Sequence, residues 1–333
     1  MNIKSLLLGS AAALAAVSGA QAADAIIAAE PEPMEYVRVC DAFGTGYFYI
    51  PGTETCLKIG GYVRFQVDFD SRDILEGGAT GDENWDAFTR GRVDFTAKSD
   101  TELGELTGFI AIQADADEDG FNNDFYLDEV YLQLGGFKAG TYLNWWDKGI
   151  NGETDKLGGN RLTSIAYIYT GDAFTAGIQL DEIEPTIDGD ARDLGIEALV
   201  SASLGAASFD LLGGYDFDAE EGAIRALVSA GVGPGTLQLA GVWASDPNTY
   251  YSRAEWSIAA SYAFKATDRF TITPGVQYDD NFLFVDGTDA WRAGLTVDYA
   301  ITSGLAMKAT VNYNDVDGVD EFWDGFVRLQ RSF

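Results

Sequence analysis

The sequence predicts an all-β protein, a 16-stranded antiparallel transmembrane β-barrel, and three observations predict it. Segments of about ten residues alternate apolar and polar side chains along almost the whole chain, as strands do when their two faces meet different surroundings. The connections between these segments are alternately short turns and long acid-rich stretches. Beyond the N-terminal leader no apolar run reaches the roughly 18 residues that a membrane-crossing helix needs, so strands must do the crossing.

The alternation is clearest in "LKIGGYVRFQVDF", where Leu57, Val63 and Phe65 share one face and Lys58, Arg64 and Gln66 share the other. A strand tilted about 45° needs about 9 to 11 residues to cross the hydrocarbon layer, and the segments have this length. The sixteen predicted strands lie at 57–69, 86–98, 104–115, 124–134, 137–145, 162–169, 173–182, 193–203, 207–217, 223–231, 235–245, 254–264, 270–279, 289–299, 305–314 and 322–333.

The connections between segments differ at the two ends of the predicted barrel. Stretches such as "TGD" at 170 and "GVGPG" at 231 are short, whereas "DSRDILEGGATGDENWD" and "NDVDGVDE" are longer and acidic. This asymmetry is typical of barrels with short periplasmic turns and long external loops. A soluble β-sandwich is the alternative, but it does not need an apolar outer face of equal height on every strand. Aromatic residues near strand ends predict girdles at the membrane interfaces, although some of them will point inward: Tyr62, Trp85, Trp145, Trp146, Trp243, Trp256, Trp291, Tyr299 and Trp323.

The chain divides into a leader, a short N-terminal segment and one barrel domain. Residues 1–22, "MNIKSLLLGSAAALAAVSGAQA", read as a secretory signal peptide with an A-x-A cleavage site. Residues 23–56 form the N-terminal segment and 57–333 the barrel. Cys40 and Cys56 are the two cysteines, and in an exported protein a disulfide between them is favoured over two free thiols.

The composition argues against catalysis. The chain has no histidine, which removes the usual nucleophile–histidine pairs and histidine-ligated zinc. With 53 acidic residues, pairs of carboxylates arise by chance and do not by themselves indicate a glycosidase-type site. We therefore expect no enzyme activity, cofactor or bound metal, and no nucleic-acid partner.

Two stretches carry a family resemblance. "RVCDAFGTGYFYIPGTETCLKIGGYVRFQVDF" near the start and "FVRLQRSF" at the end resemble the general porin family of alphaproteobacteria. The resemblance implies a homotrimer of sixteen-stranded barrels in the bacterial outer membrane, each a water-filled pore for small hydrophilic solutes. It also implies a third external loop folded into the pore, here 145–161. The final Phe333 resembles the signal recognised by the outer-membrane assembly machinery, whereas Arg331 departs from its apolar pattern.

In such a barrel, the polar side chains on the inward face of each strand would line the pore. Seven cations occupy the inward phase of five strands that barrel closure makes neighbours: Lys58, Arg64, Arg90, Arg92, Arg292, Lys308 and Arg328. The energetic cost of a cation facing lipid already explains an inward phase, but the clustering favours a function. Facing them, the loop offers Asp147, Glu153 and Asp155, so we expect a transverse field across a narrow passage. The acid excess predicts a mild cation preference that weakens with salt.

Two questions stay open at this stage. The external acids are interpreted mainly as solvating groups, although they could share divalent ions with lipopolysaccharide at the lipid surface: Asp70, Asp73, Asp117, Glu118, Asp119, Asp188 and Asp190. The alternatives to a general diffusion porin are an anion- or sugar-selective outer-membrane channel, a barrel enzyme, and a non-conducting adhesin or structural anchor.

Overall fold

A computed structural model describes residues 38–72, 84–116, 124–184 and 193–333. These ranges consist almost entirely of β-strands, together with one short 3₁₀ turn, η1 (Trp145–Asp147). None of the helical structure in them could cross a membrane. The predicted signal peptide, 1–22, lies outside the described residues.

The sixteen predicted strands are present, preceded by a two-residue strand that the alternation does not reveal. The strands are β1 (Phe48–Tyr49), β2 (Cys56–Asp70), β3 (Trp85–Thr101), β4 (Gly104–Ala116), β5 (Tyr126–Leu134), β6 (Phe137–Leu143), β7 (Arg161–Thr170), β8 (Phe174–Ile183), β9 (Asp193–Leu204), β10 (Ala207–Asp216), β11 (Glu221–Val232), β12 (Gly235–Ala244), β13 (Ala254–Lys265), β14 (Phe270–Phe282), β15 (Ala290–Thr302), β16 (Leu305–Val316) and β17 (Val319–Ser332).

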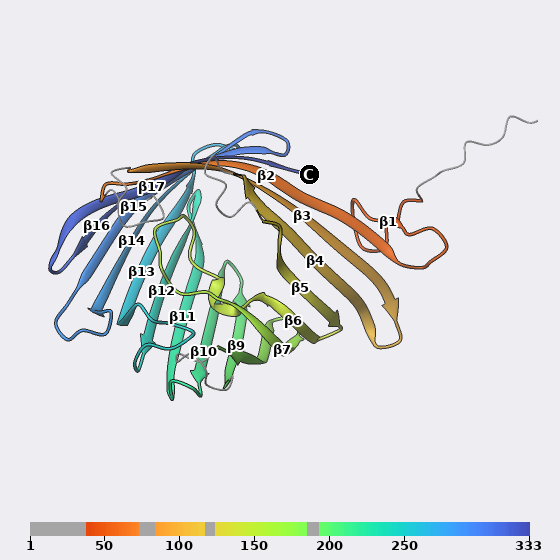
Figure 1. Cartoon of the computed structure of the whole chain (residues 1–333), viewed down its shortest axis with the longest axis horizontal. Helices are drawn as coiled ribbons and strands as arrows, with labels where there is room; N and C mark the ends of the chain where they lie inside the picture. The colour runs from red at the N-terminus through yellow and green to blue at the C-terminus, as the bar shows by residue number, and fades with distance from the viewer. Residues whose placement is uncertain (1–37, 73–83, 117–123, 185–192) are drawn as a thin grey trace, which may run out of the picture. The chain divides into compact units, whose positions relative to one another are not determined.

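Strands β2 to β17 form a closed antiparallel barrel (Figure 1). Each strand pairs with the next along the chain, and β17 pairs with β2, for example through Val327 and Val67. The closure continues to the last residue, because Phe333 and Gly61 exchange two backbone hydrogen bonds of 3.1 and 3.2 Å. Within the described residues, strands β2 to β17 leave no open edge, as a membrane-spanning sheet requires.

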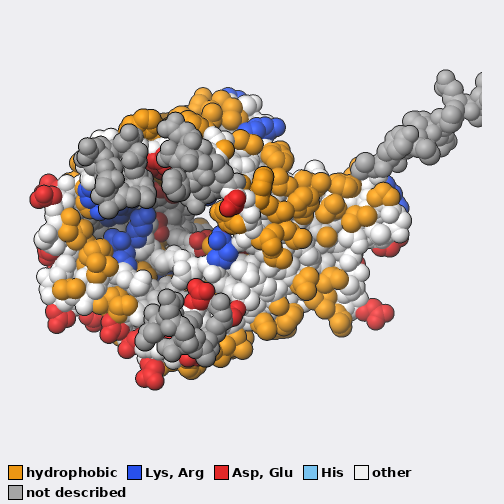
Figure 2. Space-filling model, in the orientation of Figure 1, with side chains coloured by type: hydrophobic (Ala, Val, Ile, Leu, Met, Phe, Trp, Pro, Cys, Tyr) orange, Lys and Arg blue, Asp and Glu red, His pale blue; other side chains and the backbone are white. Residues whose placement is uncertain are grey.

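The two faces of the barrel wall have opposite character. Ile224 is 50% exposed while Arg225 beside it is 4% exposed, and Leu295 is 40% exposed beside Thr296 at 0%. Every long strand carries a large apolar side chain on the outer face, with exposed fractions of 37% to 64%: Phe65, Trp85, Ile110, Leu132, Phe137, Ile165, Ile178, Val200, Leu211, Ile224, Leu239, Ile258, Val276, Leu295, Val311 and Val327. Figure 2 shows this apolar exterior and the Lys and Arg side chains gathered inside the hollow. This is the reverse of a soluble barrel and fits a wall between lipid and water.

Among the connections that lie within the described residues, the predicted alternation of short turns and longer connections is confirmed except at one place. Two-residue turns such as 205–206 and 233–234 lie at one end, and longer connections such as 144–160 and 245–253 at the other. The predicted long loop "NDVDGVDE" is wrong, because β16 and β17 continue through it and leave only Asp317 and Gly318 as a turn. Gly318 has a φ of +79°, a conformation that favours glycine.

The aromatic residues divide between an interface belt and the interior. On neighbouring strands Trp243 contacts Trp256 and Tyr313 contacts Trp323, with ring centroids 6.2 and 5.2 Å apart. Trp256 and Trp323 are half exposed on the outer face, as a girdle requires. Trp146 is one of the aromatic residues that point inward: it is fully buried and packs inside the barrel as described below.

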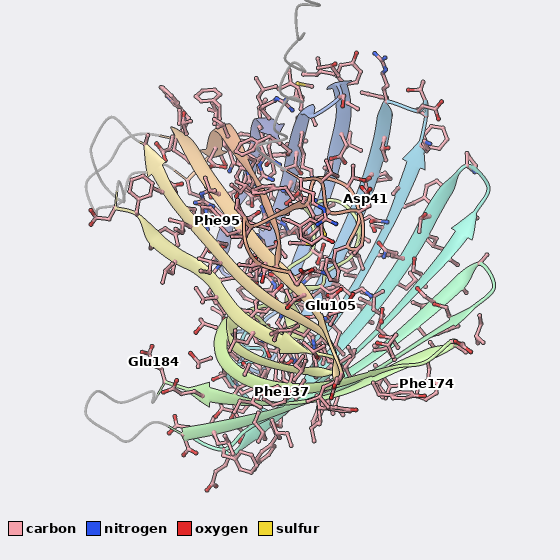
Figure 3. The ribbon with its side chains drawn as sticks, turned by 90° about the vertical axis from the view of Figure 1, so that its right-hand side faces the viewer. Asp41, Phe95, Glu105, Phe137, Phe174 and Glu184 are labelled. Carbon is pink, nitrogen blue, oxygen red and sulfur yellow. A yellow bond between two sulfur atoms is a disulfide. The ribbon has the colours of Figure 1, made fainter. Side chains whose placement is uncertain are left out.

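The segment before β2 is fixed by the predicted disulfide. Cys40 and Cys56 are bonded, with Cα atoms 6.0 Å apart, and both are buried. Tyr47 packs against this bridge and lies 5.8 Å from the Lys58 ammonium. Lys58 shares the inward phase of β2, so this part of the segment lies by the inner face at the short-turn end (Figure 3, where Asp41 marks the segment).

Candidate pore constriction

The connection between β6 and β7, residues 144–160, folds into the barrel (Figure 1). Asn144 and Asn160 close its base, because the Asn144 backbone N–H donates to the Asn160 carbonyl at 2.8 Å. The Asn160 N–H in turn donates to Asn144 Oδ1 at 3.0 Å. The predicted range, 145–161, differs by one residue at each end, since Arg161 already belongs to β7.

The root of this loop is held by a single buried guanidinium on β11. Arg225 donates to the carbonyls of Trp145, Trp146 and Leu157 at 2.9, 2.6 and 3.3 Å. These carbonyls have no strand partner, so a five-donor planar group is well suited to satisfy them together. Because Arg225 is 4% exposed and bonded to the loop, its charge serves to hold the loop in place.

A second external connection, 245–253, also enters the barrel and braces the root. The ring centroid of Trp146 is 6.2 Å from that of Tyr250 and 6.4 Å from that of Tyr251. All three side chains are buried. The Tyr250 hydroxyl donates to Asp181 at 2.8 Å. Burial, and the negative charge of Asp181, raise the pKa of the Tyr250 hydroxyl, which stays protonated and can donate.

The middle of the loop is hydrogen-bonded to the wall through its backbone. The N–H of Asn151 donates to Gln238 Oε1 at 2.6 Å, and the N–H of Glu153 donates to Thr296 Oγ1 at 2.9 Å. The N–H of Lys156 donates to Gln277 Oε1 at 2.6 Å. Backbone contacts of this kind on β12, β14 and β15 fix the course of the loop whatever its side chains are.

Two paired glycines form a niche for the loop tip. Gly275 on β14 lies opposite Gly294 on β15, and Thr154 enters the space that their missing side chains leave. A Cβ at Gly275 would lie 2.9 Å from the Thr154 Cβ, closer than packed carbon atoms tolerate. Thr154 is 2% exposed, so the tip is seated in the wall.

Of the three loop acids predicted to face the cations, one makes a direct contact. Glu153 bonds Lys308 at 2.6 Å. Asp155 instead turns back into its own loop and accepts from the Ile150 N–H at 3.4 Å. Burial raises the pKa of Asp155 to about 6. Asp147 ends the 3₁₀ turn and is exposed.

Four of the seven predicted cations form ion pairs, two of them on β3. Arg90 makes a bidentate pair with Asp115, both bonds 2.6 Å. Arg92 bonds Asp94 at 2.7 Å and also Asp128. Their charge is largely balanced within the wall.

The other two ion-paired cations are on β15 and β16. Arg292 bonds Asp324 at 2.5 and 2.7 Å. Lys308, besides its bond to Glu153, lies 3.5 Å from Asp298. Lys308 therefore links the loop to the wall.

The remaining three, Lys58, Arg64 and Arg328, have no ion pair within the described residues. Arg64 Nε donates to Gln330 Oε1 at 2.9 Å, and Arg328 Nε donates to Gln66 Oε1 at 2.6 Å. Both acceptors are neutral amides. The uncompensated positive charge of the predicted arc is thus concentrated on β2 and β17.

The residues that anchor the loop 144–160 to the wall could not be identified from the sequence. Arg225, Gln238, Gln277 and Thr296 are scattered over four strands, and Tyr250 belongs to a connection that was expected to lie outside. Arg225 alone gave a usable signal: it stands in the inward phase of β11, far from the other inward cations.

The external acids are only partly described. Asp70 pairs with Arg72 at 2.7 Å, which favours a structural role for this carboxylate. The other acids named with it, Asp73, Asp117, Glu118, Asp119, Asp188 and Asp190, lie outside the described residues.

A sealed barrel with an apolar outside, a polar inside and a loop held across its interior defines a membrane channel protein of the porin class. Comparison with known proteins agrees. The family model described as "Porin subfamily" matches residues 24–327. A putative outer membrane protein, y4fJ, of Sinorhizobium fredii is 58% identical over 342 residues, covering 100% of this chain and 99% of that protein. Porin Omp2a of Brucella suis is 36% identical over 387 residues and covers 100% of both chains.

Solved structures share the fold at low sequence identity. The outer membrane channel DcaP of Acinetobacter baumannii has a TM-score of 0.66 at 13% identity, covering 86% of this chain and 99% of that one. OmpT of Vibrio cholerae, in its trimer form, has a TM-score of 0.63 at 13% identity, covering 84% and 100%. The chain belongs to the porin subfamily and is a channel protein of the bacterial outer membrane, which confirms the resemblance noted in the sequence.

Proposed function

We propose that the protein is a general diffusion porin, which lets small hydrophilic solutes and ions pass the outer membrane passively and prefers cations mildly. The observation that carries the proposal is the course of the loop 144–160. Its bonds to Arg225, Gln238, Gln277 and Thr296 hold it along β11–β15. The wall formed by β17 and β2, where Arg328 and Arg64 have no ion pair within the described residues, supplies the basic side of the passage, and Glu153 of the loop supplies the acidic side.

Selectivity follows from where charge is balanced. Four of the seven cations are neutralised by carboxylates, so the lumen is less basic than the sequence suggests. The chain as a whole carries a net charge of −32, which concentrates cations at the mouths. We infer a net preference for cations, set at the mouths rather than in the narrow part.

The assembly partners are inferred from the family. The OmpT structure is described as a trimer form, which supports a homotrimer here. Phe333, exposed on the outer face at the end of β17, is proposed as the recognition point for the assembly machinery. Lipid contacts the apolar outer face, and contacts with lipopolysaccharide are proposed for the external acids. Porin Omp2a and the channel DcaP are named as channel proteins, which supports a non-enzymatic function.

Reversal potentials in planar bilayers test this function. Across a potassium chloride gradient at low salt we expect a reversal potential of the sign for cation preference. The preference should shrink toward 1 M salt, where the screening length falls to about 3 Å. An anion-selective potential at low salt, or failure of the reconstituted protein to conduct, would contradict the proposal.

A further inference from the structure

The two guanidiniums of Arg64 and Arg328 form a reciprocal ladder across the closure of the barrel. In the β17–β2 register Arg328 lies opposite Gln66, and Gln330 lies opposite Arg64. Each arginine donates its Nε–H to the glutamine facing it, at 2.9 and 2.6 Å. The ladder orients both guanidiniums without neutralising either.

Aromatic rings support the same orientation. The Arg64 guanidinium lies 4.6 Å from the Tyr62 ring centroid, and that of Arg328 lies 4.3 Å from the Phe326 centroid. Stacking of this kind restrains the guanidinium plane.

The two arginines line a shared cavity of about 380 Å³ with Lys308 and Arg269. Two acids also line it, and both already have a cation: Asp298 lies 3.5 Å from Lys308, and Asp268 lies 3.1 Å from Lys265. The lining of the cavity thus holds four cations and two acids, a surplus of positive charge.

Two further acids lie near the cavity, and one of them, Glu153, is ion-paired. Asp68 accepts from Gln66 Nε2 at 2.8 Å. Glu153 of the loop bonds Lys308 at 2.6 Å. In the part of the chain that the structure describes, no carboxylate bonds Arg64 or Arg328.

We propose that Arg64 and Arg328 form a transit subsite for small oxyanions, such as phosphate, a phosphate monoester or a dicarboxylate. Forked guanidinium donors match the paired oxygens of these groups. The subsite lies toward the short-turn end of the pore, because Arg269 belongs to the turn after β13 and Lys308 to the start of β16. The proposal rests on the diffusion function above, since a solute must first enter the lumen.

Single-channel currents in planar bilayers test the subsite. Sodium phosphate is added at constant ionic strength, at a pH where phosphate is a dianion. We expect a saturable reduction of the chloride current. In R64Q or R328Q the phosphate concentration for half block should rise roughly tenfold, as for the loss of one charge-assisted hydrogen bond.

Two controls separate a built site from a diffuse field. K58Q removes another inward cation without an ion pair, outside the cavity, and should leave the block unchanged. R328K keeps the charge but loses the fork and should weaken the block. Equal weakening in K58Q, or block that R64Q and R328Q leave unchanged, overturns the subsite.

The anion series and the unblocked current complete the test. A phosphate monoester and an aliphatic dicarboxylate added in place of phosphate show whether the site prefers the tetrahedral group. A wild-type channel that conducts but is not blocked by any of these anions refutes the subsite and leaves the diffusion function standing. A protein that does not conduct refutes the diffusion function itself.

Discussion

Replacing Arg225 by methionine is expected to turn a steady single-channel current into a flickering one. The three loop carbonyls that Arg225 binds lose their donor, and hydrogen bonds to charged groups contribute about 1.5 to 3 kcal/mol each. The loss of even one such bond raises the ratio of released to docked loop by a factor of about ten or more. Methionine retains much of the buried volume, so the barrel should persist.

The control for this variant is K265M. Lys265 lies at a short turn, and its side chain is 59% exposed. K265M should leave the current steady. Heat-modifiable migration on gels should show folded barrels for both variants. A steady R225M current of wild-type size would show that the loop does not depend on its buried guanidinium.

Replacing Gly275 by valine is expected to lower the conductance. The new Cβ would lie 2.9 Å from the Thr154 Cβ, and overpacking of this kind typically costs about 1 to 3 kcal/mol. Because the barrel wall is continuous behind Gly275, the loop tip can relieve the contact only by moving toward the lumen. The passage beside Glu153 should narrow.

A matched glycine substitution controls for the strand itself. Gly241 is in the middle of β12, and a Cβ there would meet nothing closer than the Ser257 carbonyl oxygen at 3.9 Å. G241V therefore introduces the same side chain without touching the loop, and its conductance should match the wild type. If G275V and G241V conduct alike, the Thr154 niche does not set the width of the passage.

The strands could be predicted because a membrane imposes a strict local rule. Lipid outside and water inside force side chains to alternate with a period of two. Val63 and Arg64, or Ile224 and Arg225, reveal their faces without knowledge of any partner. The missed strand β1 has only two residues, too few for any period. The turn at Asp317 was misplaced because the acids beside it resemble a loop, although they continue the strands.

The site was harder to predict because it depends on contacts between distant strands. Alternation gives the face of Arg90 but not the register that puts Asp115 opposite it, since a shift of two residues preserves every face. The ion pairs that neutralise Arg90, Arg92 and Arg292 were therefore invisible. The same holds for Thr154, whose niche requires Gly275 and Gly294 to lie opposite each other.

Swelling of liposomes that contain the purified protein tests the central claim most directly, that a water-filled passage runs beside the loop 144–160. With uncharged sugars of graded size outside, we predict fast uptake of the smallest, rates that fall smoothly as size increases, and no saturation with concentration. No swelling with any sugar, or rapid uptake of one sugar irrespective of its size, would contradict the account.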